Sequence, residues 1–330
     1  MPDALEARLA KLGQLTELPD PHDAVAPLRD ALKLKTNLIV ARAADVAADL
    51  ELHALNPDLI AALARWLDTL ADKDRRCWAK AGLAHALATN RAAGDDAEAV
   101  YRRAITLQQW DPVWGKTEDS AGPVRAAAAL GLVRAGSRHS LLALADLLHD
   151  HLLPVRLAAT EALGELGGEP ALALLRLRAL TDTEPEAVAA CCGVLLGIDR
   201  SDHFDTVPFV TDQLKAANDE LAERLAFAIA ESRHDQTLPL LRLYYHRTAN
   251  TDAHHAHHLA ATALAVARRE DTLNFLLDRA ADPEIDPTHI IRALAIHKHN
   301  PALREQLESA IATRPDANQY TDTLADALTS

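Results

Sequence analysis

Apolar residues recur at spacings of three and four along almost the whole chain, and Pro, Asp, Asn or Gly interrupts them at short intervals. This spacing is the period of an amphipathic α-helix that buries one of its faces. Segment 153–166 shows the pattern clearly, because it ends at Gly167, a residue type that commonly terminates helices. A second helix is predicted directly after it, over 169–181, and the pair then repeats.

Repeated helix pairs predict a single all-α array over residues 1–330, with about eight antiparallel pairs. We expect an N-terminal cap and first pair over 1–56, clear repeats over 57–313 and a C-terminal cap over 314–330. The predicted helices cover residues 22–33, 36–54, 57–70, 74–90, 96–108, 120–135, 138–149, 153–166, 169–181, 185–197, 203–216, 219–232, 235–247, 253–269, 271–281, 286–298, 301–313 and 317–328.

A column of mostly basic residues recurs once per pair when the second helices are aligned. Its steps are nearly constant except the first, which is lengthened by a non-repeating loop at 109–118 without helical periodicity. Polar residues at the preceding turns form a second column, from which a side chain can cap the following helix. The first column holds Arg76, Arg125, Arg156, Ala187, Arg224 and His258, and the second holds Asp119, Asp150, Asn218, Asp252 and Asp282.

With these two columns the chain resembles HEAT-repeat proteins, and among them the short bacterial units first named for phycobilisome lyases. The motif is Asp-x5-Arg followed by Ala-Ala-x-x-Ala-Leu-Gly, as in Asp150, Arg156 and the helix through Gly164. The resemblance covers 57–313, and 22–54 more loosely. It implies an armadillo-like α-solenoid, a right-handed superhelix whose second helices line a concave face. Ala187, His258 and the loop at 109–118 depart from the pattern.

The column of arginines has two interpretations. Each Arg can bond turn carbonyls and the Asp of its own or the next repeat, which would hold the repeats in register. Alternatively, the column can contact a partner along the concave face. We expect the structural role to dominate, and we keep Arg76, Arg125, Arg156, Arg224 and His258 as candidate partner contacts.

Composition supports helices over strands. Hydrophobic residues make up 49% of the chain, mostly Ala and Leu, whereas Trp, Tyr and Phe occur four times each and Gly twelve times. Strand-rich folds need more β-branched and aromatic residues, while Ala favours helices and lets them approach closely. Three cysteines, Cys77, Cys191 and Cys192, are too few for a disulfide scaffold.

Charge and hydropathy indicate which class of partner and which cellular location to expect. The formal net charge of −14 repels phosphate backbones, and no run of Lys or Arg exceeds a pair. The N-terminus lacks the apolar core of a secretory signal, and no uncharged stretch is long enough to span a membrane. We therefore expect a monomeric cytoplasmic protein, bacterial as the resembled units are, with a protein partner and neither nucleic acid nor membrane.

Two tryptophans stand in the loop at 109–118, where Trp110 and Trp114 make up half of the chain's tryptophans. Exposed Trp residues are common anchors of protein interfaces, so Trp110, Trp114 and the nearby Lys116 are candidate contacts. The alternative is that both rings fold back and plug the gap left by the longer repeat. The sequence leaves both readings open.

A histidine cluster at 254–258 is the other candidate for chemistry. His254 and His258 lie one helical turn apart, a spacing that can grip a transition metal, but the sequence places no third ligand beside them. The chain also lacks the His-Glu dipeptides that the resemblance to HEAT-like hydroxylases would require. We therefore expect an interaction scaffold without catalysis or cofactor; the alternative is a lyase-like or metal-dependent enzyme using His254 and His258.

Overall fold

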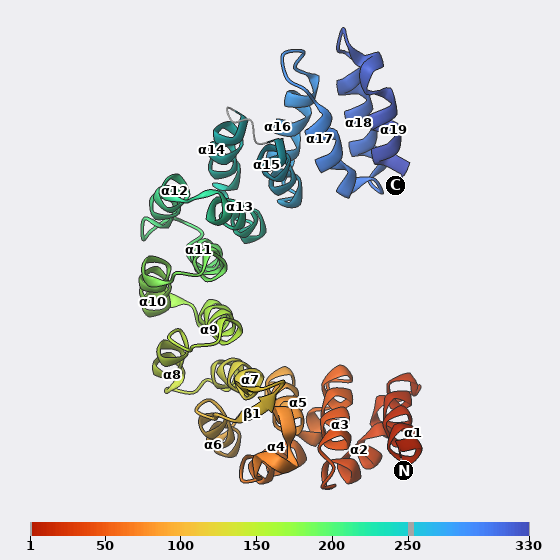
Figure 1. Cartoon of the computed structure of the whole chain (residues 1–330), viewed down its shortest axis with the longest axis vertical. Coiled ribbons are helices and arrows are strands. Elements are labelled where there is room, and N and C mark those ends of the chain that lie inside the picture. The colour runs from red at the N-terminus through yellow and green to blue at the C-terminus, as the bar shows by residue number, and fades with distance from the viewer. Residues whose placement is uncertain (1, 250–253, 330) are drawn as a thin grey trace. The chain divides into compact units, whose positions relative to one another are not determined.

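The computed structural model describes residues 2–249 and 254–329, and within them it places nineteen α-helices and two short β-strands. The all-α solenoid expected from the sequence is confirmed. The chain divides into two compact units, Met1–Ala171 and Leu172–Ser330, which we describe separately (Figure 1). No helix among the described residues is long and apolar enough to cross a membrane.

Unit 1 consists of two rows of helices. Helices α1, α3, α5, α7 and α9 pack one on the next, and α2, α4, α6 and α8 lie beside them as the other members of the pairs. Small side chains let neighbouring helices of one row approach closely: a Cβ added at Gly82 on α5 would lie 3.2 Å from the Ala41 Cα on α3. The helices are α1 (Pro2–Gly13), α2 (Val25–Leu32), α3 (Asn37–Asp49), α4 (Asn56–Leu67), α5 (Trp78–Thr89), α6 (Asp95–Ala104), α7 (Gly122–Arg134), α8 (Ser140–Leu147) and α9 (Leu153–Leu166).

Unit 2 repeats this arrangement. Helices α11, α13, α15, α17 and α19 follow one another in one row, and the Asn218 side chain caps α13 by accepting the Leu221 N–H. Helix α10 (Gly168–Thr181) crosses from unit 1 into unit 2. The remaining helices are α11 (Pro185–Ile198), α12 (Thr206–Ala216), α13 (Asp219–Ser232), α14 (Thr237–Ala249), α15 (His254–Val266), α16 (Glu270–Ala281), α17 (Thr288–Leu294), α18 (Pro301–Ala312) and α19 (Thr321–Thr329).

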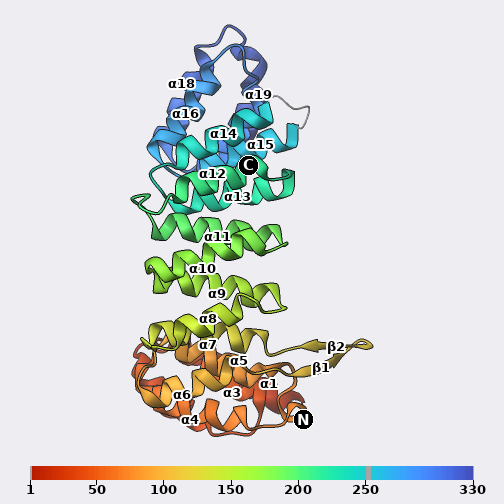
Figure 2. The same cartoon turned by 90° about the vertical axis from the view of Figure 1, so that its left-hand side faces the viewer.

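The segment expected as an irregular loop is a β-hairpin. Strand β1 (Trp110–Val113) pairs antiparallel with β2 (Lys116–Asp119), and Val113 lies opposite Lys116. Trp114 and Gly115 form the two-residue turn with φ of 46° and 82°, the positive pair of a type I′ turn. Figure 2 shows the hairpin projecting beyond the helices of unit 1.

Several helix boundaries differ from the prediction by a few residues; for example, α3 ends at Asp49 and α17 at Leu294, several residues before the predicted ends. Helix α1 was not expected, and the helix predicted over 74–90 begins only at Trp78. The delay has a local cause, because Arg76 and Cys77 both adopt left-handed backbone conformations, with φ of 61° and 54°. Such residues break the helical period, and the sequence pattern of apolar positions gives no sign of them.

Candidate functional site

Arg125 on α7 is the centre of a buried ion-pair network. Its guanidinium lies 2.8 Å from Asp119 of its own repeat and 2.8 Å from Asp150 of the next, and it donates to the Leu107 carbonyl. Burial alone would lower the Arg125 pKa, but the hydrogen bonds and charges of Asp150 and Asp119 raise it. These are the contacts of a residue that holds neighbouring repeats in register.

Arg156 and Arg224 occupy the same column but differ in exposure. Arg156 is buried on α9 and donates to the Asp150 carbonyl, so a partner would reach little of it. Arg224 on α13 is exposed and pairs with Glu186 at 3.5 Å and Glu220 at 3.8 Å. We leave Arg125 and Arg156 out of the docking surface proposed below because their side chains are buried.

The first member of the column is Lys80, and not Arg76. Lys80 lies six residues after Asp74, as Arg125 does after Asp119, and its buried ammonium is 3.7 Å from the Asp74 carboxylate. Arg76 instead lies exposed in the turn before α5. The sequence alignment chose Arg76 because it is an arginine, although the Asp-x5-Lys spacing was present in the sequence.

The last two members of the column of polar turn residues are Asp252 and Asp282. Asp252 lies outside the described residues. Asp282 is half-buried, accepts the Glu284 N–H and pairs with Arg279 at 3.4 Å. Arg314, which the sequence analysis did not single out, is buried and donates to the carbonyl of Ala280.

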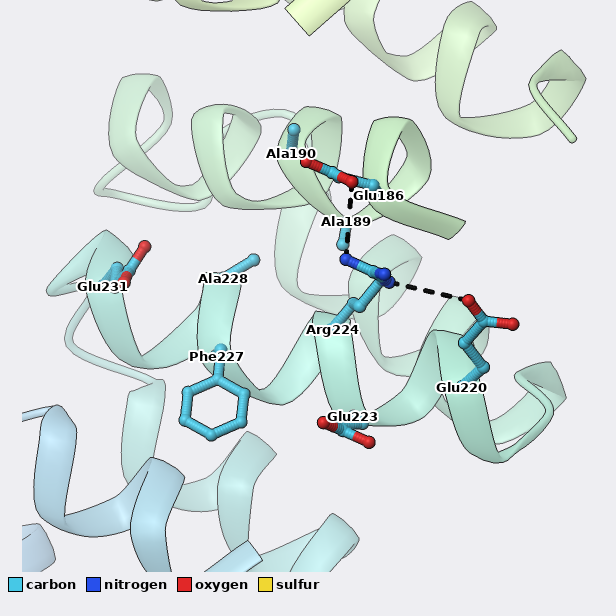
Figure 3. A pocket seen from close by; sticks show the side chains of 9 residues that line it. All are labelled: Glu186, Ala189, Ala190, Glu220, Glu223, Arg224, Phe227, Ala228 and Glu231. Carbon is cyan, nitrogen blue, oxygen red and sulfur yellow. Dashed lines mark ion pairs between the residues drawn. The ribbon is translucent and has the colours of Figure 1, made fainter. Parts of the chain in front are cut away.

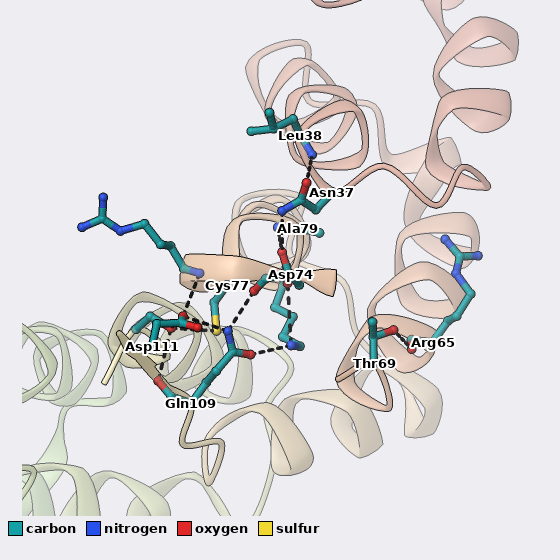
Figure 4. Close-up of polar contacts among 12 residues, drawn as sticks. Asn37, Leu38, Arg65, Thr69, Asp74, Cys77, Ala79, Gln109 and Asp111 are labelled. Atoms are coloured by element: carbon teal, nitrogen blue, oxygen red, sulfur yellow. Dashed lines mark hydrogen bonds and ion pairs between the residues drawn. The ribbon is translucent and has the colours of Figure 1, made fainter. Parts of the chain in front are cut away.

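Buried polar groups tie the hairpin to the turn before α5 (Figure 4). Asp111 on β1 accepts the Arg76 N–H at 2.7 Å, the Gln109 amide at 3.0 Å and the Ser120 hydroxyl. Gln109 also donates to the Asp74 carbonyl and accepts from the buried Lys80 ammonium. Burial would raise the Asp111 pKa, but the donors from Ser120, Gln109 and Arg76 lower it below its usual value. The carboxylate is therefore held charged and fixed.

The two hairpin tryptophans have different environments. Trp110 is 53% exposed, and its ring stacks on His151 with the centroids 5.8 Å apart. Trp114 at the turn is fully exposed. Neither ring fills a gap between repeats, since Trp110 lies against a surface side chain and Trp114 points into solvent. Trp110 thus contacts the surface at the base of the hairpin, and Trp114 is the ring presented at its tip.

A groove of about 510 Å³ lies between the hairpin and the turn before α5. We call it the hairpin groove. Basic side chains of the turn before α5 and aromatic side chains from both sides of the groove line it, and one of the latter is Trp78, which is 44% exposed. The left-handed Arg76 and Cys77 at its edge each cost about 1–2 kcal/mol in backbone strain. Such strain concentrates at functional sites. Its lining includes the cations Lys73, Arg75 and Arg76, the carboxylates Asp72 and Asp111, and the apolar side chains Trp78, Val113 and Trp114.

A second groove, of about 380 Å³, lies in unit 2 between α11 and α13. Figure 3 shows Arg224 reaching from α13 toward Glu186 on α11 and Glu220 on its own helix. Glu223 and Glu231 complete the acidic lining. The one basic side chain of this lining is thus already occupied by two of its carboxylates.

The histidines of α15 surround another histidine that the sequence did not connect with them. The ring of His289 on α17 has its centroid 5.8–5.9 Å from those of His254, His257 and His258. The buried Nδ1 atoms of His258 and His289 lack a hydrogen-bond partner. Even so, no group of three or more His, Cys, Asp or Glu in the part of the chain that the structure describes could hold a metal ion.

The comparisons with known proteins come from a family model and two solved structures. The model for HEAT repeats matches residues 115–195, from the hairpin turn into α11. This part of the chain is therefore similar to HEAT repeats. The resemblance to units of the phycobilisome-lyase type is not confirmed, because the matching model describes HEAT repeats in general. No curated protein matches the sequence.

The solved structures resemble the chain only distantly. Human deoxyhypusine hydroxylase, solved in complex with glycerol, is 17% identical with a TM-score of 0.30, over 94% of this chain and 90% of its own. An engineered protein is 16% identical with a TM-score of 0.38, over 98% and 95% of the two chains. Neither similarity carries an argument about function.

The hairpin lies at the start of the region that matches HEAT repeats, and sequence reasoning found it only in part. The two tryptophans and Lys116 drew attention to it, but the acceptor Asp111, the linker Gln109 and the second aromatic Trp78 were missed. A usable signal was Gly115 between two short segments of extended character, which is typical of a tight hairpin turn. Pro112 within β1 obscured that pattern.

Acidification is expected to destabilise the α15–α17 contact. Burial and neighbouring imidazoles lower the pKa of His257 and His289 below the usual 6.5, so the folded state binds fewer protons than the unfolded state. Their contribution is complete above pH 6.5 and is lost as the pH falls through that value toward the lowered pKa values. The groups that face the two rings are Tyr245, His246, His254, His258, Asp286 and Arg292.

Thermal unfolding of the full chain at pH 7.5 and pH 5.5 measures this effect. His289→Gln removes the central ring and should reduce the loss of melting temperature on acidification. His299→Gln, at an exposed histidine, should leave that loss unchanged. Equal losses in wild type and in His289→Gln would show that the cluster does not control the acid sensitivity.

Proposed function

We propose that this chain is a non-catalytic protein-binding scaffold and that the hairpin groove is its docking surface in unit 1. The observation that carries the proposal is the position of Trp114, a fully exposed indole at a turn residue with a positive φ. HEAT repeats generally serve as protein-interaction scaffolds, which supports this class of function.

Stability alone does not account for Trp114. The first residue of a type I′ turn is favoured as Asn, Asp or Gly, because a Cβ at a positive φ is strained. The indole gains no burial in return, since it is fully exposed. A residue that costs stability and contacts nothing within its own chain is expected to act on something outside it.

The base of the hairpin supports the same role. The buried contacts of Asp111 and Gln109 fix the strands against the turn before α5, so the presented ring moves little. A pre-organised surface loses less conformational freedom on binding, which increases affinity. Trp114 is therefore displayed on a rigid support.

Nucleophilic chemistry does not suit this groove. Cys77 is the cysteine at its edge, but its side chain is buried, and burial raises the pKa of the thiol to about 11. A protonated, buried thiol is a poor nucleophile. This supports binding over catalysis.

The cysteines also bear on location. In the described residues all three are buried and free of disulfides, as expected in a reducing compartment. We therefore include a cytoplasmic location and a single protein partner in the proposal. Arg76 belongs to the proposed surface; Arg224 and His258 remain candidate contacts in unit 2.

Replacing Trp114 with Asn tests the docking role without weakening the turn. Asn-Gly is the favoured pair for a type I′ turn, so Trp114→Asn should keep or slightly raise the melting temperature. Loss of one exposed Trp anchor at an interface typically costs 2 kcal/mol or more, about thirtyfold in affinity. Quantitative mass spectrometry of proteins captured from the host measures the loss.

Leu142→Asn is the matched control, because Leu142 is also a large exposed apolar residue of unit 1 but lies on α8, away from the groove. Proteins captured by wild type and by Leu142→Asn, yet depleted at least tenfold with Trp114→Asn, are the expected result. Identical captured sets for all three chains, with the hairpin intact, would refute the proposal.

A further inference from the structure

We infer that the hairpin groove binds an acidic segment of the partner protein that carries an aromatic or aliphatic side chain. This inference rests on the docking role proposed above and adds the chemistry of the partner. The inference is based on two features that lie close together in the groove. Exposed cations stand on the turn before α5, and an exposed tryptophan stands on each side of the groove.

The groove is lined by three cations and by the two carboxylates Asp72 and Asp111, so its small net charge is positive, opposite in sign to that of the chain as a whole. Lys73, Arg75 and Arg76 are exposed at its edge, whereas the chain has a net charge of −14. Only Lys73 has an exposed carboxylate nearby, Asp72 at 3.5 Å. Among the described residues no carboxylate pairs with the side chains of Arg75 or Arg76. Two unpaired guanidiniums offer hydrogen bonds that a carboxylate accepts well.

The apolar side of the groove calls for an apolar side chain between the acidic ones. Trp78 and Trp114 contribute exposed rings, and Val113 lines the space between the strands and the turn. The volume of about 510 Å³ suits a few side chains and not a whole helix. A short extended segment with acidic residues around one aromatic or aliphatic residue fits both sides.

The contacts of the turn fix the backbone from which the cationic side chains extend. The Arg76 N–H is held by Asp111, and Asp74 accepts the N–H groups of Ala79 and Lys80. The backbone of residues 74–80 is thus bound on both sides, and only the side chains of the two arginines remain to adapt. Cations and rings that extend from a fixed backbone distinguish a specific acidic sequence from any negatively charged surface.

Single-stranded nucleic acid also combines negative charge with flat rings, but the groove suits it poorly. Proteins that bind single strands follow the backbone with a track of cations over several nucleotides. Here the basic side chains are confined to one turn, and Asp72 and Glu118 are exposed nearby on that turn and on the hairpin. The surrounding negative charge would repel a polyanion longer than the groove.

A display library of random twelve-residue peptides, selected on the immobilised full chain after depletion on Trp114→Asn, tests the inference. The expected result is enrichment in peptides with Asp or Glu around an aromatic or aliphatic residue. Enrichment in neutral or basic peptides, or no enrichment, would overturn it. Fluorescence polarisation with labelled oligothymidine runs in parallel, and binding tighter than that of the best peptide would favour nucleic acid instead.

Charge variants give a second, independent measurement. Arg75→Gln combined with Arg76→Gln should raise the Kd of a selected acidic peptide roughly fivefold to tenfold, and added salt should reduce that difference. Arg138→Gln, at an exposed arginine of the turn before α8, is the control and should leave the Kd unchanged. An unchanged Kd in the double variant would contradict the inferred role of the arginines.

These outcomes separate the inference from the proposed function. If Trp114→Asn abolishes capture of the native partner while the selected peptides are not acidic, the groove docks a partner and only its chemistry is misassigned. If native capture survives Trp114→Asn, the docking role itself fails, whatever peptides the library returns.

Discussion

Arg125→Ala is expected to lower the free energy of unfolding of unit 1 by about 3–5 kcal/mol. Its guanidinium joins Asp119 and Asp150, and removal leaves two carboxylates near one another with their countercharge gone. Asp119 is the more affected, because its side chain is fully buried. An uncompensated buried charge costs more than the lost hydrogen bonds alone.

Hydrogen exchange measured by mass spectrometry locates the effect in the full chain. Protection of α7 and α9 should fall together in Arg125→Ala. Arg224→Ala provides the comparison within the same column, because its pairs with Glu186 and Glu220 are exposed and should contribute at most about 1 kcal/mol. Equal losses for the two variants would contradict the structural role assigned to Arg125.

Asp111→Ala should both destabilise the hairpin and disrupt the groove. The change leaves the Arg76 N–H, the Gln109 amide and the Ser120 hydroxyl without their common acceptor, at about 1–3 kcal/mol for each buried donor left unsatisfied. It also removes the contact that holds Arg76 in its left-handed conformation. We expect increased exchange over residues 74–80 and 109–120, and weaker capture of the partner.

Glu118→Ala is the matched control, because Glu118 lies directly opposite Asp111 in the strand register but is exposed. It should change neither exchange nor capture appreciably. If Asp111→Ala left the turn before α5 as protected as in wild type, the buried contacts would not be what fixes the groove.

The repeat architecture could be predicted from the sequence because the same residue types recur at short, regular spacings. Asp150 and Arg156 lie on consecutive elements at a fixed spacing, and Ala-rich helices follow them. Each helix pair packs mainly on its neighbours, so a local pattern is enough to predict a local fold. The position of Trp114 in a segment that breaks the period also pointed to the site.

The rest of the site depends on contacts between residues far apart in the chain. Asp111 bonds the backbone of Arg76, and His289 lies among histidines of α15, and no periodicity links these partners. The left-handed backbone at Arg76 and Cys77 delays the start of α5 to Trp78, which the pattern of apolar positions did not predict. Sequence periodicity predicts contacts that recur in each repeat, whereas the groove depends on contacts that occur once.

Site-specific photocrosslinking in the native host tests the docking surface most directly. A benzophenone amino acid in place of Val113 lies in the hairpin groove, and the same group in place of Leu177, an exposed leucine of α10, lies in unit 2. The account predicts a crosslinked protein at position 113 that is absent at position 177 and disappears when Trp114→Asn is added. The same adduct at both positions, or an adduct at 113 that survives Trp114→Asn, would contradict it.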